Sequence, residues 1–107
     1  MVKILLCCSA GMSTSMVVKK MEKYAQQADL KAEILAVSLE EFRDTLPRFD
    51  CCLLGPQIKY KLAEFKQVAS EFNIPVDVIN PMDYGMLNGE KIFKSALSLI
   101  AANKGAV

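Results

Sequence analysis

Hydrophobic residues follow two patterns that alternate along the chain. Short apolar runs bounded by turn residues predict β-strands at four places, residues 3–7, 32–37, 50–54 and 75–79. Between these runs, apolar residues recur at helical spacing, which predicts helices that begin near Thr14 and then occupy residues 38–42, 58–72 and the segment after Gly89. Thr14 or Ser13 is expected to cap the first helix, with Met16 among its inner residues. Residues 82–87 are expected to form a loop.

Strands that alternate with helices predict a parallel sheet with right-handed crossovers. We expect a single α/β domain over residues 1–107, a doubly wound sheet of four strands in the order 2-1-3-4 with helices on both faces. Ligands of such sheets bind beyond the carboxyl ends of the strands where the strand order reverses, here between the first and third strands. The loop after Cys8 and the turn that contains Gly55 and Gln57 are therefore predicted to flank one site.

The bulk composition is that of a folded globular domain, because 52% of the 107 residues are hydrophobic and 23% are charged. Lys and Arg number 13 against 12 Asp and Glu, and the resulting net charge of +1 argues against a nucleic-acid partner. No apolar run approaches the ~18 residues that span a bilayer, and the N-terminus lacks the pattern of a secretory signal. We therefore expect a cytoplasmic protein without direct membrane insertion.

The four cysteines form two adjacent pairs, Cys7-Cys8 and Cys51-Cys52. Without a signal sequence, a disulfide framework is not expected. Adjacent residues in a strand point to opposite faces of the sheet, so the pairs also lack the spacing of zinc ligands, and we expect no metal. The chain contains no histidine, which excludes Cys-His nucleophile pairs, Ser-His-Asp triads and histidine metal sites within it.

Cys8 stands where the first strand runs into a loop of small and polar residues that opens a helix. Backbone N–H groups in such a loop, together with the positive end of the helix dipole, bind anions. A helix N-terminus also favours the thiolate form of a nearby cysteine, whereas Cys7 is expected to point into the core. The alternative interpretation is a buried strand end followed by a polar turn. The predicted phosphate-binding loop consists of Ser9, Ala10, Gly11, Met12, Ser13, Thr14 and Ser15.

The loop invites comparison with the C-x5-R-[ST] loop of tyrosine phosphatases. Cys8 is followed by five residues and then by Thr14, which occupies the position of the arginine. Without that arginine the loop lacks a bidentate clamp and a full positive charge for the transferring phosphoryl group. A cysteine that accepts phosphate without hydrolysing it quickly is a carrier rather than a phosphatase.

Three motifs together resemble the IIB component of the bacterial phosphoenolpyruvate-dependent sugar phosphotransferase system, in its lactose/cellobiose/chitobiose branch. The resemblance covers essentially the whole chain, and it implies a fold like that of phosphotyrosine phosphatases and flavodoxins. The motifs are residues 8–15 (Cys-Ser-Ala-Gly-Met-Ser-Thr-Ser), residues 53–58 (Leu-Leu-Gly-Pro-Gln-Ile) and residues 83–85 (Asp-Tyr-Gly).

The resemblance implies that Cys8 takes a phosphoryl group from a phosphohistidine on a IIA partner. Cys8 then passes the group to a sugar, a β-linked disaccharide such as cellobiose or chitobiose, held by the membrane-embedded IIC partner during uptake. The protein would thus act as a protein-phosphocysteine–sugar phosphotransferase at the inner face of the membrane. The absence of histidine agrees with a donor histidine on another chain, and phosphoryl exchange of this kind needs neither a metal nor a nucleotide cofactor.

Three further residues are candidates at the edge of the site. Gln57 has an amide that can donate to the site, or it is a solvated residue of the first helical turn. Tyr84 either lines a docking face for IIA or IIC or is half-buried packing, and Met12 is an apolar residue at the tip of a polar loop that suits a partner surface.

Two other functions compete with the carrier. One is an enzyme like a low-molecular-weight phosphatase or an arsenate reductase, against which Thr14 argues. The other is a non-catalytic module that binds a regulatory anion in the same loop. A thioredoxin-type role is disfavoured because adjacent cysteines are not a C-x-x-C motif.

Overall fold

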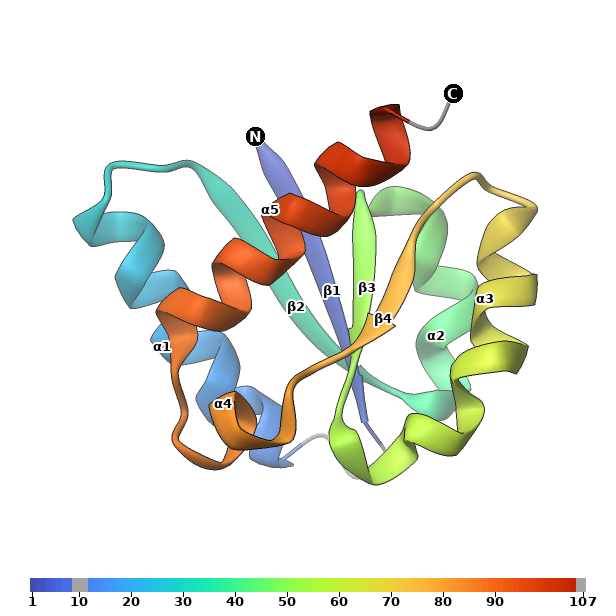
Figure 1. Cartoon of the computed structure of the whole chain (residues 1–107), viewed down its shortest axis with the longest axis horizontal. Helices are drawn as coiled ribbons and strands as arrows, with labels where there is room; N and C mark the ends of the chain where they lie inside the picture. Colours follow the sequence, from blue (N-terminus) through green and yellow to red (C-terminus); the bar gives the residue numbers. More distant parts are fainter. Residues whose placement is uncertain (9–11, 106–107) are drawn as a thin grey trace.

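A computed structural model describes residues 1–8 and 12–105 of the chain. Its strands form one parallel sheet in the order β2-β1-β3-β4, which confirms the predicted topology (Figure 1). The strands are β1 (Val2–Cys8), β2 (Ala32–Ser38), β3 (Cys51–Leu54) and β4 (Val76–Val78). The α-helices are α1 (Met12–Gln27), α2 (Phe42–Thr45), α3 (Leu62–Ser70), α4 (Pro81–Gly85) and α5 (Gly89–Gly105). Three 3-10 segments accompany them, η1 (Leu39–Glu41), η2 (Leu46–Arg48) and η3 (Pro56–Lys61).

Helices pack on both faces of the sheet (Figure 1). A hydrophobic core lies on each face, as a doubly wound fold requires. Alternation along β1 divides its residues between them. Ile4 and Leu6 pack with α1 and α5, whereas Leu5 and Cys7 pack with α2 and α3. All four side chains are fully buried, so β1 is the central strand of both cores and its carboxyl end is held firmly.

The first helix differs from the prediction at its start. It begins at Met12, so Thr14 lies within the helix, and neither Thr14 nor Ser13 caps it as expected. The side chain of Met16 is 55% exposed, whereas that of the next residue, Val17, is fully buried. The expected inner face, which includes Val17, Met21 and Ala25, is thus buried, and the assignment of Met16 to it is wrong.

The predicted loop at residues 82–87 is wrong over residues 82–85, because these belong to the short helix α4, and Met86 and Leu87 form a turn after it. The Asn80 side chain accepts hydrogen bonds from the N–H groups of Met82 and Asp83, at 2.8 and 3.3 Å. Pro81 occupies the first turn, where its missing N–H costs nothing. An Asn-Pro pair is thus a helix start here as well as a strand stop, and this signal was present in the sequence.

The other helices follow the prediction more closely, with altered boundaries. The segment predicted as one helix over residues 58–72 begins at Pro56 as η3, breaks at Ile58, where φ and ψ are not helical, and continues as α3. The segment predicted at 38–42 extends through η1, α2 and η2. The last helix is confirmed, with Ile92 and Phe93 buried against α1.

Candidate functional site

Cys8 is the last residue of β1, and its side chain lies against the first turns of α1. The Sγ atom of Cys8 is 3.1 Å from Oγ1 of Thr14, and either atom can be the donor of this hydrogen bond. Both side chains are enclosed, since Cys8 is 2% exposed and Thr14 is fully buried. The two residues belong to one predicted site, and the structure brings their reactive atoms together between the strand and the helix that flank the loop.

The remaining loop residues can be placed only in part. Ser9, Ala10 and Gly11 lie outside the described residues, as do the side chains of Met12 and Ser13. The backbone of Met12 and Ser13 forms the first turn of α1, and Ser15 is exposed one residue after Thr14. The position that holds arginine in the phosphatase loop is thus filled by a buried hydroxyl, and the two arginines of the chain are Arg43 in α2 and Arg48 in η2.

Gly55 connects the carboxyl end of β3 to Cys8. Its N–H donates to the carbonyl oxygen of Cys7 at 2.9 Å, which joins the ends of β1 and β3. A Cβ atom on Gly55 would lie 2.7 Å from Oε1 of Gln57 and 3.3 Å from Cβ of Cys8. The side chains of Gln57 and Cys8 are therefore both packed against the same point of the Gly55 backbone, and only a residue without a side chain leaves them both in place.

Gln57 also reaches the other predicted edge residue. Its Nε2 donates to the hydroxyl of Tyr84 at 3.3 Å, which links η3 to α4 across the carboxyl edge of the sheet. Gln57 is exposed and Tyr84 is half-buried. Each residue could be placed near the site from the sequence, but nothing in the sequence indicated that they bind one another, because they stand 27 positions apart in the chain.

Two helices at this end of the sheet, α1 and α4, carry exposed methionines. Met16 on α1 and Met82 and Met86 at α4 are 55%, 73% and 71% exposed, and we call these three residues the methionine rim. Both α1 at its start and α4 lie at the end of the molecule where the strands terminate (Figure 1). The sequence analysis missed the rim, because Met16 was assigned to the core and residues 82–87 to a loop.

The other three cysteines are buried, free thiols within the sheet. Burial, with smaller contributions from Cys8 and Glu41, raises the pKa of Cys7 to about 12. Burial and the charge of Asp50 raise the pKa of Cys51 to about 12, and burial holds the pKa of Cys52 well above its ordinary value. These three thiols are neutral at physiological pH and serve as apolar packing.

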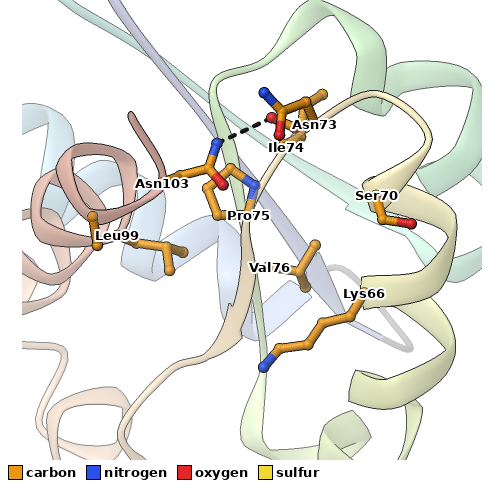
Figure 2. A pocket seen from close by; sticks show the side chains of 9 residues that line it. Lys66, Ser70, Asn73, Ile74, Pro75, Val76, Leu99 and Asn103 are labelled. Atoms are coloured by element: carbon orange, nitrogen blue, oxygen red, sulfur yellow. Dashed lines mark hydrogen bonds between the residues drawn. The ribbon is translucent and has the colours of Figure 1, made fainter. Parts of the chain in front are cut away.

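The groove shown in Figure 2 lies beside the start of β4, whereas Cys8 lies at the carboxyl end of β1. It has a volume of about 450 Å³ between α3, the start of β4 and the end of α5. Asn103 donates to the carbonyl oxygen of Asn73 at 3.1 Å and thereby ties α5 to the turn before β4. None of the residues that line the groove belongs to the Cys8 site. We therefore do not assign the groove to the functional site.

Two findings concern only the part of the chain that the structure describes. None of its helices is long and apolar enough to cross a bilayer. No three side chains of the metal-binding types among residues 1–8 and 12–105 come close enough together to hold a metal ion.

Comparison with solved structures defines the class of protein. The chain superposes with a TM-score of 0.80 on the cellobiose-specific phosphotransferase IIB component of Borrelia burgdorferi, with 37% identity, covering 95% of this chain and 94% of that one. It superposes with a TM-score of 0.83 on the lactose-specific IIB domain of the phosphoenolpyruvate:carbohydrate phosphotransferase system of Streptococcus pneumoniae, covering 92% and 96%. The sequences of this chain and the Streptococcus domain are only 18% identical, so this comparison shows a shared fold alone.

Sequence comparison gives the family. Residues 3–95 match the family described as the lactose/cellobiose-specific IIB subunit of the PTS system. The oligo-β-mannoside-specific EIIB component of Bacillus subtilis is 45% identical over 94% of this chain and 97% of its own length. The galactose-specific EIIB component of Lactococcus lactis subsp. cremoris is 39% identical over 91% and 94%. The chain therefore belongs to the lactose/cellobiose-specific IIB family, whose members take part in phosphoryl transfer during sugar uptake.

Proposed function

We propose that Cys8 is the residue that carries the phosphoryl group, receiving it from a phosphohistidine on a IIA partner and passing it to a sugar bound by a IIC partner. The observation that supports this assignment is the hydrogen bond between Cys8 Sγ and Thr14 Oγ1 at the switch point of the sheet. The other three thiols are held neutral in the cores, and the chain has no histidine to act as an internal carrier. The protein is then a protein-phosphocysteine–sugar phosphotransferase formed by a single IIB domain over residues 1–107.

The transfer is an in-line displacement at phosphorus. The sulfur of Cys8 forms the S–P bond while the P–N bond to the partner's histidine breaks, and the proton lost by the thiol balances the one gained by the leaving imidazole. Positioning and charge stabilisation supply the catalysis, so no cofactor is required. We assign the stabilisation to the Thr14 hydroxyl, the positive end of α1, the Gln57 amide and the loop. The loop residues are Ser9, Ala10, Gly11, Met12, Ser13, Thr14 and Ser15.

The absence of arginine from the loop distinguishes a carrier from a phosphatase. Thr14 provides one neutral donor where a phosphatase provides a charged, bidentate one. A phosphoryl group on Cys8 is consequently stabilised less in the transition state of hydrolysis, and it survives until an acceptor arrives.

The methionine rim is the surface that we assign to the protein partners. Methionine side chains adapt their shape to different surfaces, and both IIA and IIC must approach the same sulfur. Met16, Met82 and Met86 expose apolar area on α1 and at α4, at the end of the molecule where β1 ends in Cys8, and a partner that brings its histidine or its sugar to the sulfur would cover this end. Tyr84 and Gln57 line the same edge.

The names of the relatives support a proposal for the sugar and for the location. Those relatives are named for oligo-β-mannosides, galactose and cellobiose, and we infer a β-linked disaccharide such as cellobiose or chitobiose as the cargo. Because IIC is the component that holds the sugar in the membrane, the IIB protein works in the cytoplasm and is recruited to the inner face of the membrane through IIC.

One experiment tests the assignment. The protein is mixed with phosphoenolpyruvate, the general phosphotransferase proteins and a matching IIA, and the intact chain is then weighed. Wild type is expected to gain one phosphoryl mass, Cys8→Ser none, and the control Cys7→Ser the same as wild type. An unmodified wild-type chain in the presence of phosphorylated IIA would contradict the proposal, and rapid turnover of an aryl phosphate would indicate a phosphatase instead.

A further inference from the structure

The amide group of Gln57 has its two ends in different surroundings. Its Nε2 points to the hydroxyl of Tyr84, to which it donates at 3.3 Å. Its Oε1 faces the Gly55 backbone, on the side where Cβ of Cys8 also packs. The amide thus turns an acceptor toward the cysteine side and a donor toward Tyr84.

This orientation suits a thiol but opposes a phosphoryl group. A carbonyl oxygen beside a phosphoryl dianion places like partial charges next to one another, whereas an NH2 group donates to the same oxygens in a charge-assisted bond. A phosphoryl group on Sγ also extends further from Cβ of Cys8 than the thiol does, and therefore further toward its neighbours. The better arrangement for the phosphorylated protein is the opposite orientation of the same amide.

Tyr84 can satisfy the amide in both orientations. A phenolic hydroxyl is both a donor and an acceptor, so it accepts from Nε2 in one state and donates to Oε1 in the other. The phenol need not move, because the Asn80 cap holds α4 and the ring of Tyr84 packs against the core beneath it. By contrast, an acceptor-only or donor-only partner would bind one orientation alone.

We propose that the Gln57 amide turns end for end when Cys8 is phosphorylated, and that Tyr84 is the positioning residue that holds it in both orientations. The inference rests on the proposed function of Cys8. In the thiol state Gln57 donates to Tyr84, and in the phosphorylated state Tyr84 donates to Gln57 while the NH2 group donates to the phosphoryl oxygens. Loading and unloading of Cys8 thereby reverse one hydrogen bond and leave α4 in place.

The test is the response of the Gln57 side-chain amide to Tyr84→Phe, measured by NMR on protein with 15N-labelled glutamine. In the unphosphorylated protein, Tyr84→Phe is expected to shift the NH2 resonances of Gln57, because it removes their acceptor. In the phosphorylated protein the same substitution is expected to leave them nearly unchanged, because they then bind phosphoryl oxygens. Tyr24→Phe, which removes a hydroxyl from α1 away from the site, is the matched control. Equal shifts in the two states would overturn the proposal.

Gln57→Glu gives a second, independent readout. A carboxylate accepts at both ends and cannot donate to a phosphoryl group, so the equilibrium between phosphorylated IIA and the variant is expected to shift toward IIA by about tenfold or more. Gln67→Glu, an exposed substitution on α3 with the same change of charge, is the control. An unchanged equilibrium in Gln57→Glu would also overturn the proposal. Failure of the underlying function is distinct, because wild type would then take no phosphoryl group at all.

Discussion

The hydroxyl oxygen of Thr14 lies 3.1 Å from the sulfur of Cys8, with both side chains shielded from water. This contact spans the loop, because Cys8 ends β1 and Thr14 is in α1. A hydrogen bond is stronger in such surroundings than at the surface, and it strengthens again when the sulfur carries negative charge. The pair therefore ties the end of β1 to the first turns of α1 and places a hydroxyl donor beside the sulfur.

Replacement of Thr14 by valine is expected to slow phosphoryl transfer from IIA to Cys8 by about 10- to 100-fold, because it removes the donor and keeps the shape. The rate is measured by rapid mixing with phosphorylated IIA and quantification of the phosphorylated chain. Thr14→Ser keeps the hydroxyl and should retain most of the rate. Equal loss in the serine and valine variants would assign the effect to packing rather than to the hydrogen bond.

Gly55 is expected to tolerate no side chain without a change at the site. In Gly55→Ala the added methyl group would displace the Gln57 amide, which lies 2.7 Å from its position, and press on Cys8 at 3.3 Å. Since the nearest group is a flexible side chain, the cost in unfolding free energy should be only about 1 kcal/mol, while transfer to Cys8 falls by about tenfold. Activity and urea unfolding are compared with those of Gly85→Ala, where a methyl group meets nothing within 4 Å. A loss of activity in Gly85→Ala as large as in Gly55→Ala would contradict this account.

A different outcome is expected for Gly89, at the start of α5. A Cβ atom there would clash with the backbone of Lys20 and Met21, so the backbones of α5 and α1 would have to separate. Gly89→Ala should therefore lower the unfolding free energy by about 3 kcal/mol, the upper range for overpacking. Chemical denaturation measures the change. If Gly89→Ala loses less unfolding free energy than Gly55→Ala, then α1 and α5 are free to shift apart and this account of the clash is wrong.

Much of this fold could be predicted from the order of apolar runs. Buried strands such as β1 and β3 are continuous hydrophobic segments, and their alternation with helical patterns determines a parallel sheet. Cys8 could be placed at the switch point for the same reason. Local capping was less visible: Asn80-Pro81 reads as a strand terminator and, in the structure, also starts α4.

Contacts between distant residues were beyond the sequence. The bond between Gln57 and Tyr84 depends on how η3 and α4 pack at one edge, and a hydrogen bond between side chains far apart in the chain leaves no periodic pattern. The exposure of Met16 was missed for a related reason. Met16 and Val17 both fit the inner face of a helix by their spacing, and only the packing of α1 in the fold determines that Val17 is buried and Met16 is not.

The methionine rim is expected to affect partner recognition and not folding. Met82 and Met86 are largely exposed, so the double variant Met82→Ser, Met86→Ser should unfold within about 0.5 kcal/mol of wild type. If partners cover these side chains, KM for phosphorylated IIA should rise by about tenfold while kcat stays nearly constant. Leu30→Ser, an exposed apolar residue after the end of α1, controls for loss of surface hydrophobicity. An unchanged KM in the double variant would remove α4 from the docking surface.

Alkaline pH should destabilise the protein through the three buried thiols. The pKa values of Cys7 and Cys51 are about 12 in the folded chain, and that of Cys52 is also raised, against about 8.5 for an unfolded thiol. As pH rises above about 8.5 the unfolded chain loses these protons first, so unfolding becomes more favourable; below that pH the thiols have no such effect. Each thiol should lower the unfolding free energy by about 1.4 kcal/mol per pH unit until its folded pKa is reached.

Urea unfolding under reducing conditions between about pH 7 and pH 10 measures this dependence. Lysines and tyrosines also titrate in the upper part of this range, so the slope of wild type alone does not isolate the thiols. Cys52→Ala removes one of the three thiols, so the part of the slope of unfolding free energy against pH that comes from thiols should fall by about one third. The smaller side chain also lowers the unfolding free energy by an amount that does not depend on pH. If the slope of Cys52→Ala equals that of wild type, burial of this thiol does not set the alkaline limit of the fold.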